Sequence, residues 1–169
     1  MKNITQRNLS LQVQYHLIDK NYIPLENSSG ICCANCNKII ANIATVRDDN
    51  GNSYDIGFDC FETLLINNSL LSTNDIQEYE KAKKMLPKIL KFSKVIKEVL
   101  EHNNNKSINI TGLLFDKSMC FSGGIYFYWL QNNKTESRDN YYYKMKEVEL
   151  EFLMKILKNI FPKLDIIAK

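Results

Sequence analysis

Residues 33–37, Cys-Ala-Asn-Cys-Asn, and residues 57–60, Gly-Phe-Asp-Cys, decide how the first part of this chain folds. Two cysteines separated by two residues can bind one tetrahedral metal ion from a tight backbone turn. Asn37 suits such a turn, because asparagine tolerates left-handed backbone angles. The last cysteine adds a third sulfur at the start of a helix-like run, where the positive end of a helix would favour the thiolate. We therefore predict that these cysteines bind one Zn²⁺ ion: Cys33, Cys36 and Cys60.

A tetrahedral zinc site needs a fourth ligand, and the sequence leaves its identity open. We rank the candidates in the order Cys32, Cys120, His16 and Asp59. Cys32 comes first because it adjoins Cys33, so that either cysteine can be the ligand and the other a spare.

We expect the zinc to be structural and not catalytic. Glu62 is the one carboxylate on the following helix that can act as a general base, and the His-x-Glu and Cys-x-x-Cys pattern of zinc deaminases is absent. A redox role for the Cys-x-x-Cys segment would need a thioredoxin-like βαβ context, which the surrounding sequence does not provide. Reduced cysteines without any metal are the third interpretation.

The composition of the 169 residues is that of a globular protein, with 44% hydrophobic and 24% charged residues. No apolar run approaches the roughly 20 residues that a membrane helix needs, so we expect no membrane association. The polar N-terminus leads into no hydrophobic signal region, which predicts a cytoplasmic location. Five cysteines are an odd number, and four of them lie in the first 60 residues. In a reducing compartment this clustering favours a metal over disulfides.

The N-terminal part reads as short strands around a tight turn. Residues 9–25 alternate loosely between apolar and polar side chains, which predicts a strand or extended arm. Residues 38–46 are rich in β-branched side chains and predict a second strand, and residues 53–58 predict the strand that returns. Between these two, Asn50-Gly51 supplies the positive φ angles that a hairpin turn requires.

Residues 31–71 resemble a treble-clef zinc module. The resemblance rests on the order of the predicted elements: a Cys-x-x-Cys knuckle, then a hairpin, then a helix that carries the next cysteine. Such modules usually take two ligands from their second half, whereas Thr63 and Leu64 stand where another ligand would follow Cys60. The stretch from Tyr15 to Leu65 also resembles uncharacterised small proteins of Bacteroidota genomes, plasmids and phages. These share a Cys-x-x-Cys, a hairpin and an Ile-Gly-x-Asp-Cys segment, a likeness that implies no function.

The rest of the chain predicts a helix–strand–strand–helix core. Asn74 and Gln77 form a capping-box pattern that would begin a long helix containing Pro87, where we expect a kink or two abutting helices. Strands are expected over residues 107–115 and 124–130, and a last helix over 140–161. The predicted fold is therefore α+β, with a zinc-stabilised β-hairpin and helix module at 1–72 and an α+β domain with a basic helix at 73–169.

The first long helix has a run of lysines without a single acid between Lys81 and Lys97. A solvated surface in a lysine-rich chain is the plainer interpretation. The local charge is nevertheless large for a protein whose net charge is only +3, and it would attract nucleic-acid phosphates or an acidic protein surface. The predicted binding residues are Lys81, Lys84, Lys88, Lys91, Lys94 and Lys97.

Phosphate loops, nucleophile elbows and dinucleotide fingerprints are absent from the sequence. The leading hypothesis is a non-enzymatic binding protein that acts on RNA, DNA or a nucleoprotein complex. An inhibitor of host defence carried by a phage or mobile element, in the manner of an anti-CRISPR protein, would fit its size and charge. The alternatives are a zinc-dependent enzyme that modifies nucleic acids and a structural adaptor for an acidic protein. The oligomeric state is left open.

Overall fold

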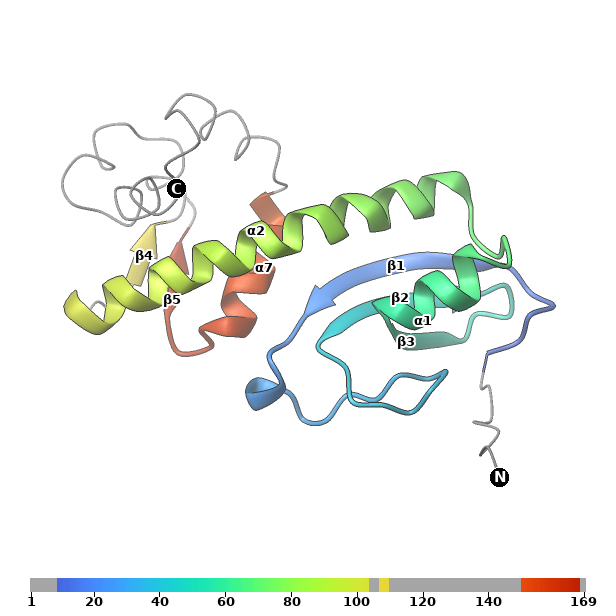
Figure 1. Cartoon of the computed structure of the whole chain (residues 1–169), viewed down its shortest axis with the longest axis horizontal. Helices are drawn as coiled ribbons and strands as arrows, with labels where there is room; N and C mark the ends of the chain where they lie inside the picture. Colours follow the sequence, from blue (N-terminus) through green and yellow to red (C-terminus); the bar gives the residue numbers. More distant parts are fainter. Residues whose placement is uncertain (1–8, 104–106, 110–149, 168–169) are drawn as a thin grey trace. The chain divides into compact units, whose positions relative to one another are not determined.

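The computed structural model describes residues 9–103, 107–109 and 150–167 of the chain (Figure 1). It confirms the predicted α+β class, with a three-stranded antiparallel sheet and several helices. The chain divides into two compact units, Met1–Lys84 and Met85–Lys169, and the boundary between them falls within helix α2 (Thr73–Asn103). None of the helices in the described ranges is long and apolar enough to span a membrane.

The sheet of the first unit has the strand order β1-β2-β3, with the middle strand β2 (Asn42–Asp48) antiparallel to both neighbours (Figure 1). β2 and β3 (Ser53–Gly57) form the hairpin that the sequence predicted. The third strand, β1 (Tyr15–Tyr22), lies within the expected 9–25 segment, and its register shifts at Ile18, which stays exposed. A short 3₁₀ turn, η1 (Leu25–Asn27), follows it.

The hairpin turn is held by one carboxylate. Asp48 is buried, and its oxygens accept hydrogen bonds from the N–H groups of Asn50 and Asn52 at 3.0 and 2.8 Å and from the Tyr54 hydroxyl at 3.2 Å. Gly51 has φ +87°, as predicted, whereas Asn50 does not have the positive φ that the Asn-Gly pattern predicted for it. The turn therefore combines a backbone angle that favours glycine with a carboxylate that several donors surround.

The hairpin leads directly into a helix that carries Cys60. Its first turn, α1 (Phe58–Cys60), continues into the π-helical segment η2 (Phe61–Ile66), and α1 contacts β2. The wider π-type spacing is visible in the hydrogen bond from the Asn67 N–H to the Glu62 carbonyl, five residues back, at 3.1 Å.

Tyr79 of α2 is the aromatic centre of this unit's core. Its ring stacks on Phe61, with centroids 4.3 Å apart, and meets Phe58 edge-on at 4.9 Å. Its hydroxyl donates to Glu62 at 2.7 Å, so the buried polar atom has a partner. Burial and the neighbouring carboxylate together raise the pKa of Tyr79. The start of α2 is thereby tied to the helix that carries Cys60.

The predicted capping box at Asn74 and Gln77 is wrong, because α2 begins at Thr73 and Ser72 is its N-cap. The Ser72 hydroxyl accepts the N–H of Asp75 at 3.1 Å and donates to its carboxylate at 2.9 Å. The helix then continues through Pro87 as one element instead of two abutting helices.

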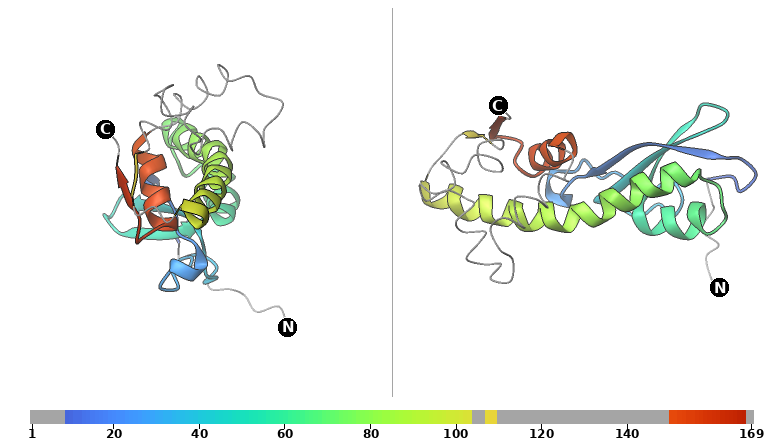
Figure 2. Two further views of the ribbon diagram at one scale, coloured as in Figure 1. Left: turned by 90° about the vertical axis from the view of Figure 1, so that its left-hand side faces the viewer. Right: turned by 90° about the horizontal axis from the view of Figure 1, so that it is seen from above.

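In the second unit, α7 (Leu150–Ile160) and part of α2 supply the buried side chains, which include Ile89, Leu153 and Ile156. β4 (Ser107–Asn109) and β5 (Asp165–Ile167) pair in parallel and lie side by side (Figure 2). The sequence predicted the start of β4 and the end of the last helix, but it missed β5. The strand expected at 124–130, the rest of 107–115 and the helix part at 140–149 lie outside the described residues.

We predict that Gly51→Val lowers the free energy of unfolding by about 1–2 kcal/mol, because a β-branched residue resists a left-handed backbone. No atom lies within 4 Å of the site of an added Cβ, so the cost is conformational and not steric. Gly51→Asn is the matched control, since asparagine tolerates positive φ, and it should unfold close to wild type in urea. Equal destabilisation by both substitutions would contradict this account of the turn.

A second prediction concerns how the stability contributed by Asp48 depends on pH. Burial raises the pKa of Asp48, but the hydrogen bonds from Asn52, Tyr54 and Asn50 outweigh it and hold the pKa below its ordinary value. The carboxylate therefore stabilises the fold fully above the unfolded pKa of about 3.9, and this contribution is lost as the pH falls through the lower folded pKa. Asp48→Asn should be less stable than wild type at neutral pH, and urea unfolding should show the deficit shrinking below pH 4. Asp49→Asn should keep the wild-type acid dependence.

Candidate metal centre

The Cys-x-x-Cys segment folds as a knuckle of backbone hydrogen bonds. The N–H of Asn37 donates to the carbonyl of Cys33 at 2.8 Å, and the N–H of Cys33 donates to the carbonyl of Lys38 at the same distance. Asn37 has φ +58°, the left-handed conformation that the sequence predicted. This reversal brings the two cysteines of the segment to one side of the turn.

Two further contacts attach the knuckle to the sheet. The residues on either side of it pair with each other, through an antiparallel bridge of Cys32 with Ile39. Within the knuckle, the N–H of Ala34 donates to the carbonyl of Asp55 in β3 at 2.8 Å. The knuckle is therefore held beside the strand whose end leads to Cys60.

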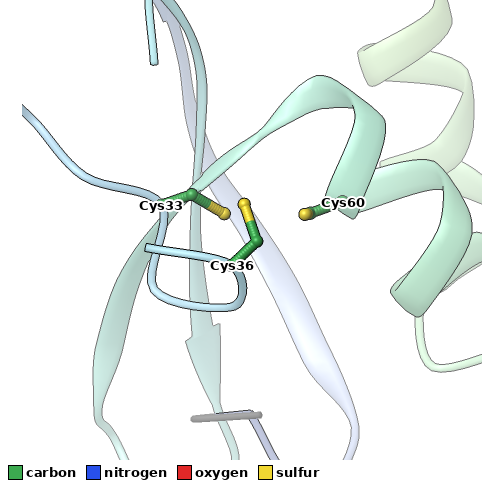
Figure 3. A group of neighbouring side chains, drawn as sticks. All are labelled: Cys33, Cys36 and Cys60. Atoms are coloured by element: carbon green, nitrogen blue, oxygen red, sulfur yellow. The ribbon is translucent and has the colours of Figure 1, made fainter. Parts of the chain in front are cut away.

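The structure brings Cys33, Cys36 and Cys60 together. Their sulfurs lie within 4.8 Å of one another and point toward a common centre (Figure 3). Two come from the knuckle and one from α1, so the group joins segments that are separated by more than twenty residues. Three converging thiols at this spacing can hold a metal ion.

Two hydrogen bonds to sulfur orient the cluster. The backbone N–H of Gly57 donates to Cys33 Sγ, and the side-chain amide of Asn35 donates to Cys60 Sγ, both at 3.4 Å. Such donors around the ligands fix their geometry and stabilise negative sulfur. The other end of the same amide, Asn35 Oδ1, is buried and has no hydrogen-bond partner within the described part of the chain.

The three thiols differ in acidity. Burial raises the pKa of Cys33, but the N–H of Gly57 and the neighbouring N–H groups and thiol of the knuckle outweigh it, so the pKa lies below its ordinary value. For Cys60, burial and the two neighbouring sulfurs raise the pKa to about 11, against the hydrogen bond from Asn35. Three thiolates so close together repel one another, and a bound cation would offset that repulsion.

The other predicted ligands have different surroundings. Cys32 is outside the group of three; its thiol is exposed and lies 3.4 Å from the Gly30 carbonyl oxygen. His16 lies 3.4 Å from the carboxylate of Asp49, and Asp59 is exposed at the start of α1. Cys120 lies outside the described residues. A fourth ligand is thus absent from the cluster as far as the described residues show.

Glu62, the one candidate general base that the sequence offered for a catalytic zinc, is engaged elsewhere. Its carboxylate pairs with Lys83 and accepts the Tyr79 hydroxyl, and these interactions, led by Lys83, hold its pKa below the ordinary value. A carboxylate with a lowered pKa is a weaker base, so this environment does not favour proton abstraction.

The lysines of α2 fall into two groups. Lys81 pairs with Glu78 at 2.8 Å, and Lys83 pairs with Glu62. The other five are exposed, and the structure shows no ion pair for them among the described residues; they are Lys84, Lys88, Lys91, Lys94 and Lys97.

Asn35 is the residue of this site that sequence reasoning missed. It stands between the two cysteines of the knuckle, where an amide can reach a ligand brought in from elsewhere. Only the position of Cys60 shows which sulfur it contacts.

No protein-family model, curated protein or solved structure matches this chain. The order of knuckle, hairpin and helix that the sequence predicted is the order observed in the structure.

We predict that the purified, reduced protein holds one metal ion per chain. Cys36→Ser and Cys60→Ser should each lower its metal content, because each removes one of the three converging sulfurs. Cys32→Ser is the matched control: it removes an exposed neighbouring thiol and should leave the metal content unchanged. Elemental analysis alongside protein quantification measures all four proteins. A metal-free wild type, or metal loss in Cys32→Ser alone, would overturn the assignment.

Proposed function

We propose that the metal is Zn²⁺ and that its role is structural. Thiolates are soft ligands that suit zinc, and a Cys-x-x-Cys knuckle with a cysteine at a helix start is an arrangement that zinc modules use. Structural zinc contributes on the order of 10 kcal/mol to the folding of small modules. Here it would join the knuckle to α1, and thereby to the Tyr79 core.

We propose further that the chain is a non-enzymatic binding protein whose α2 contacts the phosphate backbone of nucleic acid. One observation carries this proposal: the row of exposed lysines without acidic partners in the described residues, Lys84, Lys88, Lys91, Lys94 and Lys97. Lys81 was included in the predicted face, but its pairing with Glu78 makes it a weaker candidate.

The first three lysines of this row are Lys84, Lys88 and Lys91, and their spacings of four and three residues keep them on one face of the helix. Lys94 and Lys97 follow at steps of three. Since a helix has 3.6 residues per turn, they lie progressively further to one side. A row that drifts around a helix in this way can follow a curved line of phosphates.

The chemistry of lysine favours contact without sequence reading. An ammonium group is a point charge that binds phosphate through electrostatic attraction, whereas arginine reads guanine through a planar pair of donors. The exposed row contains no arginine. We therefore expect affinity that depends strongly on salt and weakly on sequence.

We predict that changing Lys84, Lys88 and Lys91 together to Glu abolishes binding to RNA or DNA oligonucleotides. Each phosphate contact that is lost should flatten the log–log dependence of affinity on salt by about 0.7–0.9 units. Electrophoretic titration of single- and double-stranded RNA and DNA at two salt concentrations measures both effects.

The matched control is Lys38, Lys158 and Lys163 changed to Glu, which alters net charge equally at exposed positions off this face. It should retain most of the affinity, and both variants should keep the wild-type circular dichroism spectrum. If wild type shifts no oligonucleotide at low salt, direct nucleic-acid binding is refuted and a protein or nucleoprotein partner takes its place. If both variants lose affinity equally, net charge and not this face is responsible.

A further inference from the structure

A small hollow adjoins the cysteine cluster. Its volume is about 230 Å³, which is below the usual range for drug-sized ligands. Its walls come from the segment after the knuckle and from the end of β3 with α1. The lining residues are Cys36, Lys38, Ile39, Ile40, Ala41, Asn42, Gly57, Phe58, Asp59 and Cys60.

One cysteine of the cluster is shielded from the hollow, and the other two line it. Cys33 is 1% exposed, accepts the Gly57 N–H, and does not line the hollow. Cys36 and Cys60 are half-buried and do line it. A metal bonded to these two sulfurs can therefore be reached from the hollow.

The three cysteines leave one coordination position of a tetrahedral metal ion without a ligand. A tetrahedral ion takes four ligands, and the described residues bring three sulfurs together. The buried Asn35 Oδ1, on the amide whose nitrogen contacts Cys60, lacks a partner in the described part of the chain. A buried carbonyl oxygen without a donor is costly, but Asn35 does not line the hollow, so the open position rests on the count of three sulfurs.

We propose that the metal centre is open and that a small thiol entering through the hollow takes the fourth position. This rests on the proposed metal site. In the resting state a water would occupy the position. When a thiol binds, its sulfur forms a bond to the metal, its proton passes to solvent and the water leaves as a neutral molecule. The three cysteines keep their bonds throughout, and no atom changes oxidation state.

The hollow favours a thiol over other small ligands for two reasons. A zinc ion with three thiolates is a soft centre, which prefers sulfur to oxygen donors. The walls are mixed: Ile40, Ala41 and Phe58 are available to a short alkyl chain, and Lys38, Asn42 and Asp59 add polar groups that suit a thiol with a polar end. A simple alkyl thiol is small enough to enter a hollow of about 230 Å³.

Cobalt substitution tests the proposal on the full chain, reduced with a phosphine and free of added thiol. Co²⁺ should bind once per chain with sulfur-to-metal absorption typical of three thiolates. Titration with 2-mercaptoethanol should raise that absorption per cobalt by about one third, as three sulfur ligands become four, and should saturate. Zinc should compete the cobalt away.

Two variants locate the binding. Ala41→Phe fills the hollow while leaving every sulfur in place, so it should bind Co²⁺ with the three-thiolate spectrum and lose the response to thiol. Asn42→Trp, at an exposed position on the same lining, gives a second version if Ala41→Phe fails to bind cobalt. Ser29→Phe, at an exposed turn off the lining, is the control and should respond as wild type does.

The outcomes separate this inference from the proposed metal site. Failure to bind cobalt would refute the metal site itself. Cobalt bound with no response to thiol, or stripped out by it, would refute the open position alone. A four-thiolate spectrum before thiol is added, reduced to three in Cys120→Ser or Cys32→Ser, would show that the chain closes its own site. An unchanged response in both hollow-filling variants would place the thiol elsewhere.

Discussion

The hydrogen bond from the Gly57 N–H to Cys33 Sγ is the contact on which the arrangement of the first unit depends. It joins the knuckle to the end of β3, at the residue where the chain turns into α1. A side chain at this position would be crowded, since an added Cβ would lie 3.0 Å from Ile40 Cγ2. Glycine therefore permits the close approach that lets Cys60 face the other two sulfurs.

The cluster is connected to the core through a short chain of contacts. Cys60 ends α1, the next residue, Phe61, stacks on Tyr79, and the Tyr79 hydroxyl reaches Glu62. A metal bound at the cluster would therefore connect the knuckle, through Cys60, to the aromatic core. The π-helical spacing of η2 begins directly after Cys60, in keeping with the tendency of such segments to occur at functional sites.

Charge is distributed unevenly over the first long helix. Near its start, Glu78 pairs with Lys20 of β1 and Lys83 pairs with Glu62 of η2, so these two pairs help to attach α2 to the rest of the unit, whereas the Lys81–Glu78 pair lies within the helix. Further along, the exposed lysines have no such partners in the described residues, and their mutual repulsion is a cost that a polyanion would relieve. The cysteine cluster and the lysine row share no residue, so variants can test the two features separately.

The features that the sequence determined by itself are local: the knuckle with its left-handed Asn37, the Asn50-Gly51 turn and the lysine spacing follow from backbone preferences and helical periodicity. The tertiary structure decided what depends on distant partners. Only it shows that β1 joins the hairpin, that β5 pairs with β4, and that Asn35 contacts Cys60 while Cys32 lies outside the group. The capping error has the same origin, since several polar residues near the helix start can act as an N-cap and the packing of the preceding segment selects Ser72. Contacts between residues far apart in sequence leave no periodic signal, so the folded chain alone reveals them.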